Sequence, residues 1–70
     1  MKKEERYRYI KGVILKYQTI KDVSDEVLYR VLHKAKATYS SRKSNPETFT
    51  VEELITLYDY LGVPQEEREI

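Results

Sequence analysis

The chain has no cysteine and no tryptophan, and only two glycines and two prolines among its 70 residues. Without cysteine it has neither a disulfide framework nor a thiolate metal site, which favours a reducing compartment, and we expect the cytoplasm. The longest purely aliphatic run, Val13 to Leu15, falls far short of the roughly 20 residues that span a bilayer. The charged N-terminus is also unlike the apolar region of a signal peptide, so we expect neither membrane association nor export.

Catalytic and metal-binding patterns are equally scarce. His33 is the only histidine, so a metal site would have to rely on carboxylates, and we expect no metal or other cofactor. Ser40 and Ser41 have no base at a recognisable motif spacing, and no glycine-rich phosphate loop is present. We therefore expect neither an enzyme nor a small-molecule substrate.

Charge is spread unevenly along a chain that is nearly neutral overall, with a net charge of +1. Residues 27–46 carry five basic side chains and no acidic one, whereas residues 47–70 carry seven acidic side chains and one basic one. A middle segment that attracts anions is therefore followed by an anionic end. At this length the chain makes one small domain, which we place at residues 1–63, with residues 64–70 as a flexible tail.

Hydrophobic spacing predicts helices throughout. The first helix runs from about Glu4 to Tyr17, and residues 18–23 form a loop. Ser24 is the expected N-cap of the second helix. Apolar residues at helical spacing give the first helix a buried stripe of Tyr7, Ile10, Ile14 and Tyr17, and the second a buried face of Val27, Leu28, Val31 and Leu32.

Two further helices complete the pattern. A short polar helix spans residues 35–44, with Tyr39 as its only large apolar anchor, and a left-handed Asn45 followed by Pro46 ends it. The last helix begins at a capping box formed by Thr50 and Glu53 and ends at Gly62. Its apolar stripe is expected to consist of Val51, Leu54, Ile55, Tyr58 and Leu61.

These helices resemble the helix-turn-helix domain shared by the lambdoid phage repressors, the Cro proteins and the XRE-type regulators. Val23 and Ser24 match the apolar residue and cap that open the first motif helix, and His33 stands at the glycine of the turn. The stretch from Thr50 to Val63, "TVEELITLYDYLGV", matches the closing helix of the family. The resemblance implies an all-α, compact four- to five-helix bundle of the lambda-repressor type.

It also implies a transcriptional regulator, a repressor or Cro-like protein of a phage or mobile element, that reads double-stranded DNA with the helix at residues 35–44. A symmetric homodimer on a two-half-site operator is the expected form. Short side chains would let this helix approach the bases, while lysines neutralise phosphates. The implied DNA-binding residues are Lys34, Lys36, Ala37, Thr38, Ser40, Ser41 and Lys43.

A protein-interaction module on the same fold is the alternative, for example an antirepressor, an antitoxin or an inhibitor of a host factor. Asp25 and Glu26 carry negative charge at the start of the second helix, and Tyr29 replaces a residue that is usually small in the family. The anionic last third of the chain also favours a protein partner. The sequence leaves both functions open.

Overall fold

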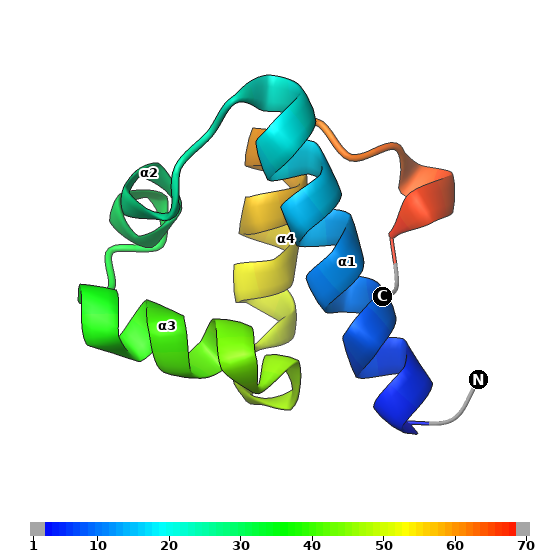
Figure 1. The fold of residues 1–70 in the computed structure, drawn as a ribbon, viewed down its shortest axis with the longest axis horizontal. Helices are drawn as coiled ribbons and strands as arrows, with labels where there is room; N and C mark the ends of the chain where they lie inside the picture. Colours follow the sequence, from blue (N-terminus) through cyan, green and yellow to red (C-terminus); the bar gives the residue numbers. More distant parts are fainter. Residues whose placement is uncertain (1–2, 69–70) are drawn as a thin grey trace.

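Four α-helices and two short 3-10 turns form the part of the chain that the structure describes, residues 3–68 of a computed structural model (Figure 1). No strand occurs among these residues, which confirms the expected all-α fold. None of these helices combines the length and the apolar character needed to cross a membrane. The elements are α1 (Lys3–Lys21), α2 (Asp25–Val31), α3 (Lys36–Ser44), η1 (Pro46–Thr48), α4 (Val51–Leu61) and η2 (Gln65–Glu67).

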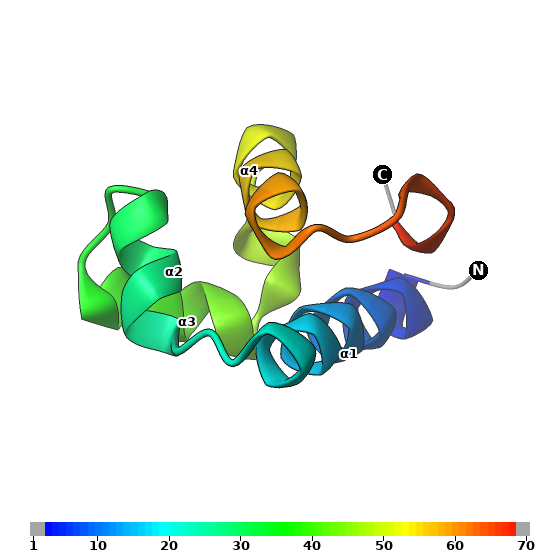
Figure 2. The same cartoon turned by 90° about the horizontal axis from the view of Figure 1, so that it is seen from above.

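Helices α1 and α4 pack against each other, and α2 and α3 lie together to one side of them (Figure 2). In Figure 1 α2 is seen nearly end-on while α3 lies across the view, so the two helices run in different directions. The radius of gyration is 11.1 Å, close to the value of about 11 Å typical of a folded chain of this length.

Three tyrosines are central to the core. Tyr17, Tyr39 and Tyr58 are buried, as their positions on the apolar stripes predicted, and Leu28 and Leu32 supply the buried face of α2. Val27 and Val31, predicted on the same face, are only half-buried. The remaining core side chains are Ile10, Val13, Ile14, Phe49, Leu54, Leu57, Leu61 and Val63.

Three helices end in the same way, at a residue in the left-handed conformation. Asp22 (φ 55°), His33 (φ 57°) and Gly62 (φ 69°) follow α1, α2 and α4. In each case the next residue donates its backbone N–H to a carbonyl five residues earlier, at 2.9 Å, which is the bond of a Schellman motif. Glycine adopts this conformation without strain, and aspartate and histidine are among the few other residues that tolerate it.

The first helix is longer than predicted. Residues 18–21, which were expected in a loop, form its last turn. Gln18 is buried at 7% exposure, and its side-chain Nε2 donates to the Val23 carbonyl at 3.3 Å and to the Asp25 carboxylate at 2.7 Å. A buried polar side chain with these partners holds the last turn of α1 against α2. The helix therefore ends only at Asp22.

Helix α4 begins as predicted, at a complete capping box: Glu53 N–H donates to the Thr50 hydroxyl at 3.1 Å, and Thr50 N–H to the Glu53 carboxylate at 2.9 Å. Its predicted stripe was partly wrong. Val51 and Ile55 are 55% and 40% exposed, whereas Leu57, which the prediction omitted, is fully buried. The buried face is centred on Leu54, Leu57, Tyr58 and Leu61 because α4 is covered by both α1 and α2.

The predicted left-handed Asn45 was also wrong. Asn45 has φ −126° and ψ 78°, and Pro46 after it is buried at the start of η1. A proline disfavours the helical conformation in the residue before it and pushes that residue toward extended backbone. Proline alone therefore accounts for the end of α3.

The C-terminal segment, for which the sequence suggests a flexible tail at residues 64–70, makes contacts with α1 and α4 in its described part. Residues 65–67 form the turn η2, and the Glu67 carboxylate accepts a bond from Lys16 Nζ at 2.8 Å and one from the Tyr17 hydroxyl. Arg68 Nη1 lies 2.7 Å from the Asp59 carboxylate on α4. These contacts join the described end of the chain to α1 and α4; residues 69 and 70 lie outside the described residues.

Candidate nucleic-acid interface

Helix α3 is anchored by one large side chain. Tyr39 is 1% exposed. The centroid of its ring lies 6.5 Å from that of Tyr29 on α2 and 6.3 Å from that of Phe49, which follows η1. Tyr29 is partly buried and packs beside Tyr39, so the two rings join α2 to α3. Burial raises the pKa of the Tyr39 hydroxyl well above its ordinary value of 10.0, so the phenol is neutral at physiological pH.

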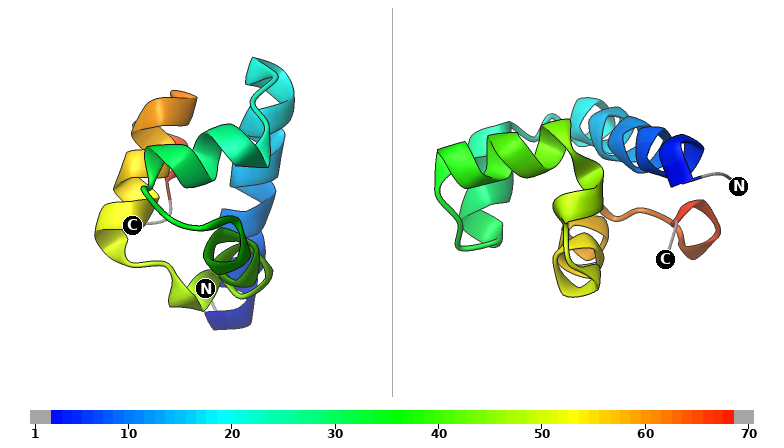
Figure 3. Two further views of the ribbon diagram at one scale, coloured as in Figure 1. Left: turned by 90° about the vertical axis from the view of Figure 1, so that its left-hand side faces the viewer. Right: turned by 90° about the horizontal axis from the view of Figure 1, so that it is seen from below.

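The opposite side of α3 faces outward and carries short side chains. Seen from below, α3 runs along the outer edge of the molecule (Figure 3, right). A shallow hollow of about 430 Å³ lies along it, lined in part by Ala37, Thr38 and Ser41. Five of the seven predicted DNA-binding residues are exposed on this helix: Lys36, Ala37, Thr38, Ser40 and Ser41.

The N-terminal end of α3 is open and positively charged. Ala35 is the N-cap residue and has no side-chain oxygen with which to bond the first backbone N–H groups. Lys34 and Lys36 flank it, both exposed and both without an ion-pair partner among residues 3–68. Free N–H groups and the positive end of the helix dipole favour an anion at such a terminus.

Lys43, the seventh predicted residue, stands apart from the others. Its Nζ lies 2.8 Å from Oδ1 of Asp25, the first residue of α2, and its side chain is only 23% exposed. Burial alone would raise the pKa of the Asp25 carboxyl, but its hydrogen bonds with Lys43 and Gln18 outweigh this effect and hold the pKa below its usual range. At neutral pH, Lys43 is therefore paired with a carboxylate.

The other two cations of the middle segment are also paired. Arg30 Nη2 lies 2.6 Å from Glu26 one turn earlier on α2, at the exposed surface. Arg42 forms a largely buried ion pair with Glu53 of the capping box and donates to the Thr48 carbonyl at 3.2 Å. Of the five basic residues in this segment, only Lys34 and Lys36 have no carboxylate partner in the described residues.

Sequence reasoning missed the roles of Gln18 and Arg42. Gln18 lies in a segment that the sequence predicts to be a loop, so its burial has no sequence signal. Arg42 did have one, because it is three residues from Tyr39 and so shares the inward side of α3. A long-range partner such as Glu53, eleven residues away, cannot be read from helical spacing.

A second hollow of about 380 Å³ lies between the α2–α3 turn and the start of α4, with His33, Lys34 and Arg42 on one side and Glu52 and Glu53 on the other. Nowhere in residues 3–68 do three or more His, Cys, Asp or Glu side chains gather in a way that could hold a metal ion. The lining of this hollow carries basic and acidic side chains, of which Arg42 and Glu53 form an ion pair. No family model, curated protein or solved structure matches the chain.

Proposed function

We propose that this chain is a cytoplasmic, helix-turn-helix DNA-binding protein that regulates transcription by placing α3 in the major groove of a promoter. The observation that carries the proposal is the outward face of α3. On that face Ala37, Thr38 and Ser41 are exposed beside Lys36, while Tyr39 fixes the opposite side in the core.

Side-chain size is the first physical support. A major groove about 12 Å wide admits a helix only when its side chains allow the backbone to approach the base edges. Alanine and threonine methyl groups can contact the methyl of thymine, and hydroxyl groups can donate to or accept from any base. The exposed side chains of α3 are short and include alanine, threonine and serine, which supports both the close approach and these contacts.

The turn between α2 and α3 is the second support. The left-handed conformation of His33 provides the sharp reversal that glycine provides in the family the sequence resembles. Lys34 and Lys36 beside this turn would contact phosphates and orient the helix. A single module with few base contacts binds weakly, so we propose a homodimer on two half-sites.

Salt dependence tests the proposal most directly. We expect binding to the DNA that flanks the protein's own reading frame to be tighter than binding to random duplex in a fluorescence anisotropy titration. The affinity should fall with a log–log salt slope of about −0.9 per phosphate contacted. Lys36→Ala should reduce the magnitude of the slope by about one contact per protomer.

Lys21→Ala is the matched control. Lys21 is an exposed lysine at the end of α1 next to Gly62, has no ion pair among the described residues, and should leave the slope unchanged. If the protein binds neither duplex at low salt, the DNA proposal is wrong. The protein-interaction module would then be favoured, and its partner would bind without this slope.

A further inference from the structure

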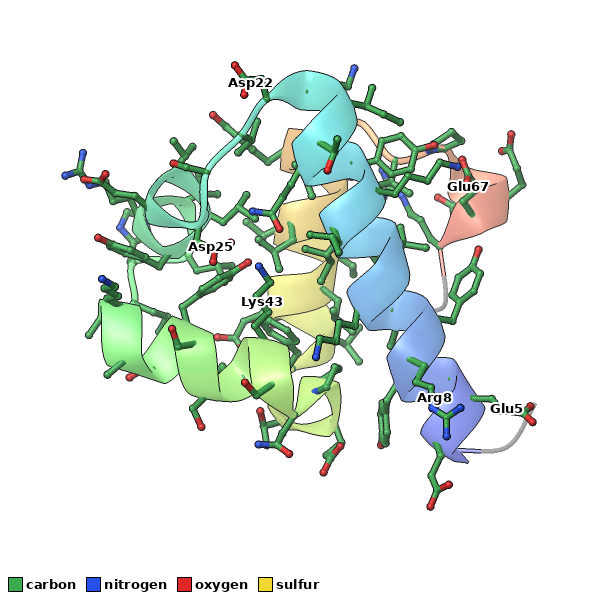
Figure 4. All side chains as sticks on the ribbon, viewed as in Figure 1. Glu5, Arg8, Asp22, Asp25, Lys43 and Glu67 are labelled. Atoms are coloured by element: carbon green, nitrogen blue, oxygen red, sulfur yellow. The ribbon has the colours of Figure 1, made fainter. Side chains whose placement is uncertain are left out.

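The carboxylate of Asp25 joins three helices at one point. Its Oδ1 accepts from Gln18 Nε2 on α1 at 2.7 Å and lies 2.8 Å from Lys43 Nζ on α3, while Asp25 itself begins α2. Gln18 is buried, so its amide is held in place and in turn orients the carboxylate. Figure 4 shows Asp25 and Lys43 pointing toward one another between α2 and α3.

Lys43 would extend the row of basic groups on α3 if it were free. Lys36, Ser40 and Lys43 are spaced four and three residues apart and so lie along one side of the helix, at the border between its exposed face and its buried side. Lys36 and Lys43 are about 10 Å apart along the axis. Of these two lysines, only Lys36 has no ion-pair partner in the described residues.

We infer that Asp25 limits the DNA affinity of this protein by holding Lys43 in an intramolecular ion pair, so that a phosphate must compete with Asp25 for Lys43. The inference rests on the proposed function. The competition matters because Lys43 side-chain exposure is only 23%, and its ammonium group already has a charge-assisted bond to an oriented acceptor. Asp25 thereby lowers the affinity for phosphates in general, so that binding depends more on the contacts that α3 makes with bases.

Asp25→Asn is the variant that isolates this effect. Asparagine keeps an oxygen that can accept from Gln18 but removes the charge that pairs with Lys43. Asp22→Asn is the control: it removes one charge three residues away, Asp22 has no ion pair among residues 3–68, and asparagine tolerates its φ of 55°. Asp22 also points away from the Asp25–Lys43 pair (Figure 4).

Anisotropy titrations of random-sequence duplex over a salt series supply the main readout. Asp25→Asn should tighten binding several-fold at low salt and steepen the slope by about 0.9 for each Lys43 released. Asp22→Asn should leave the slope as in the parent protein. Lys43→Gln should weaken binding far more in the Asp25→Asn background than in the parent, which a double-mutant cycle measures.

A DNA-free measurement separates this inference from the proposed function. In a carboxyl NMR titration, Asp25 should titrate at a higher pH in Lys43→Gln than in the parent protein. If the two titrations coincide, or if Asp25→Asn and Asp22→Asn change DNA binding equally, the inference is wrong even though the parent protein binds DNA. If the pair is seen by NMR and no variant binds DNA, both the proposed function and the role of Asp25 in it are wrong.

Discussion

At the scale of single residues, the left-handed backbone at Asp22, His33 and Gly62 determines where three helices stop. Gly62 has no Cβ to strain, and a Cβ added there would meet only the end of the Lys21 side chain at 3.6 Å. His33 and Asp22 adopt the same conformation although each has a Cβ, and this raises their conformational energy. The chain thus has strain at the one turn that orients α3, where glycine would have none.

Substitution of His33 should measure that strain. His33 is exposed, so His33→Gly removes little packing, and we expect the free energy of unfolding to rise by about 1 kcal/mol because glycine relieves the left-handed backbone. His33→Val should lower it, since a β-branched residue is least tolerated there. Urea unfolding with unchanged m-values would measure both. Equal stability of the two variants would mean that the turn is not strained.

At the scale of elements, α3 is joined to its neighbours by few contacts. Tyr39 is its only fully buried side chain, and polar links to other elements include the Lys43–Asp25 and Arg42–Glu53 ion pairs and the bond from Arg42 to the Thr48 carbonyl. Arg42 lies on the inward side of α3, three residues after Tyr39. It ties the end of α3 to the capping box of α4, so one carboxylate, Glu53, serves both helices.

Removal of Arg42 should therefore affect more than one helix. Arg42→Met leaves the Glu53 carboxylate, whose side chain is only 11% exposed, without its cation, and we expect a loss of about 2 kcal/mol in unfolding free energy. The double variant Arg42→Met/Glu53→Gln should lose less, because no unpaired charge remains buried and glutamine can still accept from Thr50. A double variant less stable than Arg42→Met alone would contradict this account.

Elements with strong local signals were predictable, and those defined by distant partners were not. The start of α4 follows from Thr50 and Glu53 alone, and the anchoring role of Tyr39 follows from its being the only large apolar side chain of its helix. The extension of α1 depends on Gln18 meeting Asp25, and the state of Lys43 depends on the same carboxylate. For the candidate interface, the outward face of α3 was therefore predictable, whereas the charge available on it was not.

At the scale of the whole molecule, ionisable groups join the described C-terminal segment to the core. Bonds from Lys16 and Tyr17 lower the pKa of the Glu67 carboxyl, and the same carboxylate raises the pKa of both Lys16 and Tyr17. Burial raises the pKa of Tyr39 in the core. Stability therefore depends on protonation at both ends of the pH range.

We expect a plateau of stability between these limits. Carboxyls with a lowered pKa stabilise the fold above their ordinary values, 4.5 for Glu67 and 3.8 for Asp25, and this stabilisation is lost as the pH falls below them. Phenols with a raised pKa stabilise it below their ordinary value of 10.0, and this is lost as the pH rises further. Urea unfolding at a series of pH values would give the profile.

Two variants would identify the groups that control the acidic and the alkaline side of this pH profile. Glu67→Gln should flatten the acidic side and also remove the contribution of Tyr17 to the alkaline side, because the Glu67 carboxylate raises the Tyr17 pKa. Tyr39→Phe should reduce the alkaline side alone, because burial raises the Tyr39 pKa. Tyr39→Phe also removes a buried hydroxyl that has no hydrogen-bond partner in the described residues, so it should not destabilise the protein at neutral pH. A profile unaffected by either change would show that other groups control the pH dependence.

The outward face of α3 can be varied without disturbing the packing of the core. Substitutions at exposed positions that make no special contact usually change stability by less than about 0.5 kcal/mol. Five exposed positions of α3 supply no side chain to the core, so a library randomised there should keep its thermal stability, which thermal unfolding of its members would measure. Substitution of Lys36, Ala37, Thr38, Ser40 and Ser41 therefore changes the outer surface of α3 while the rest of the chain stays a constant scaffold.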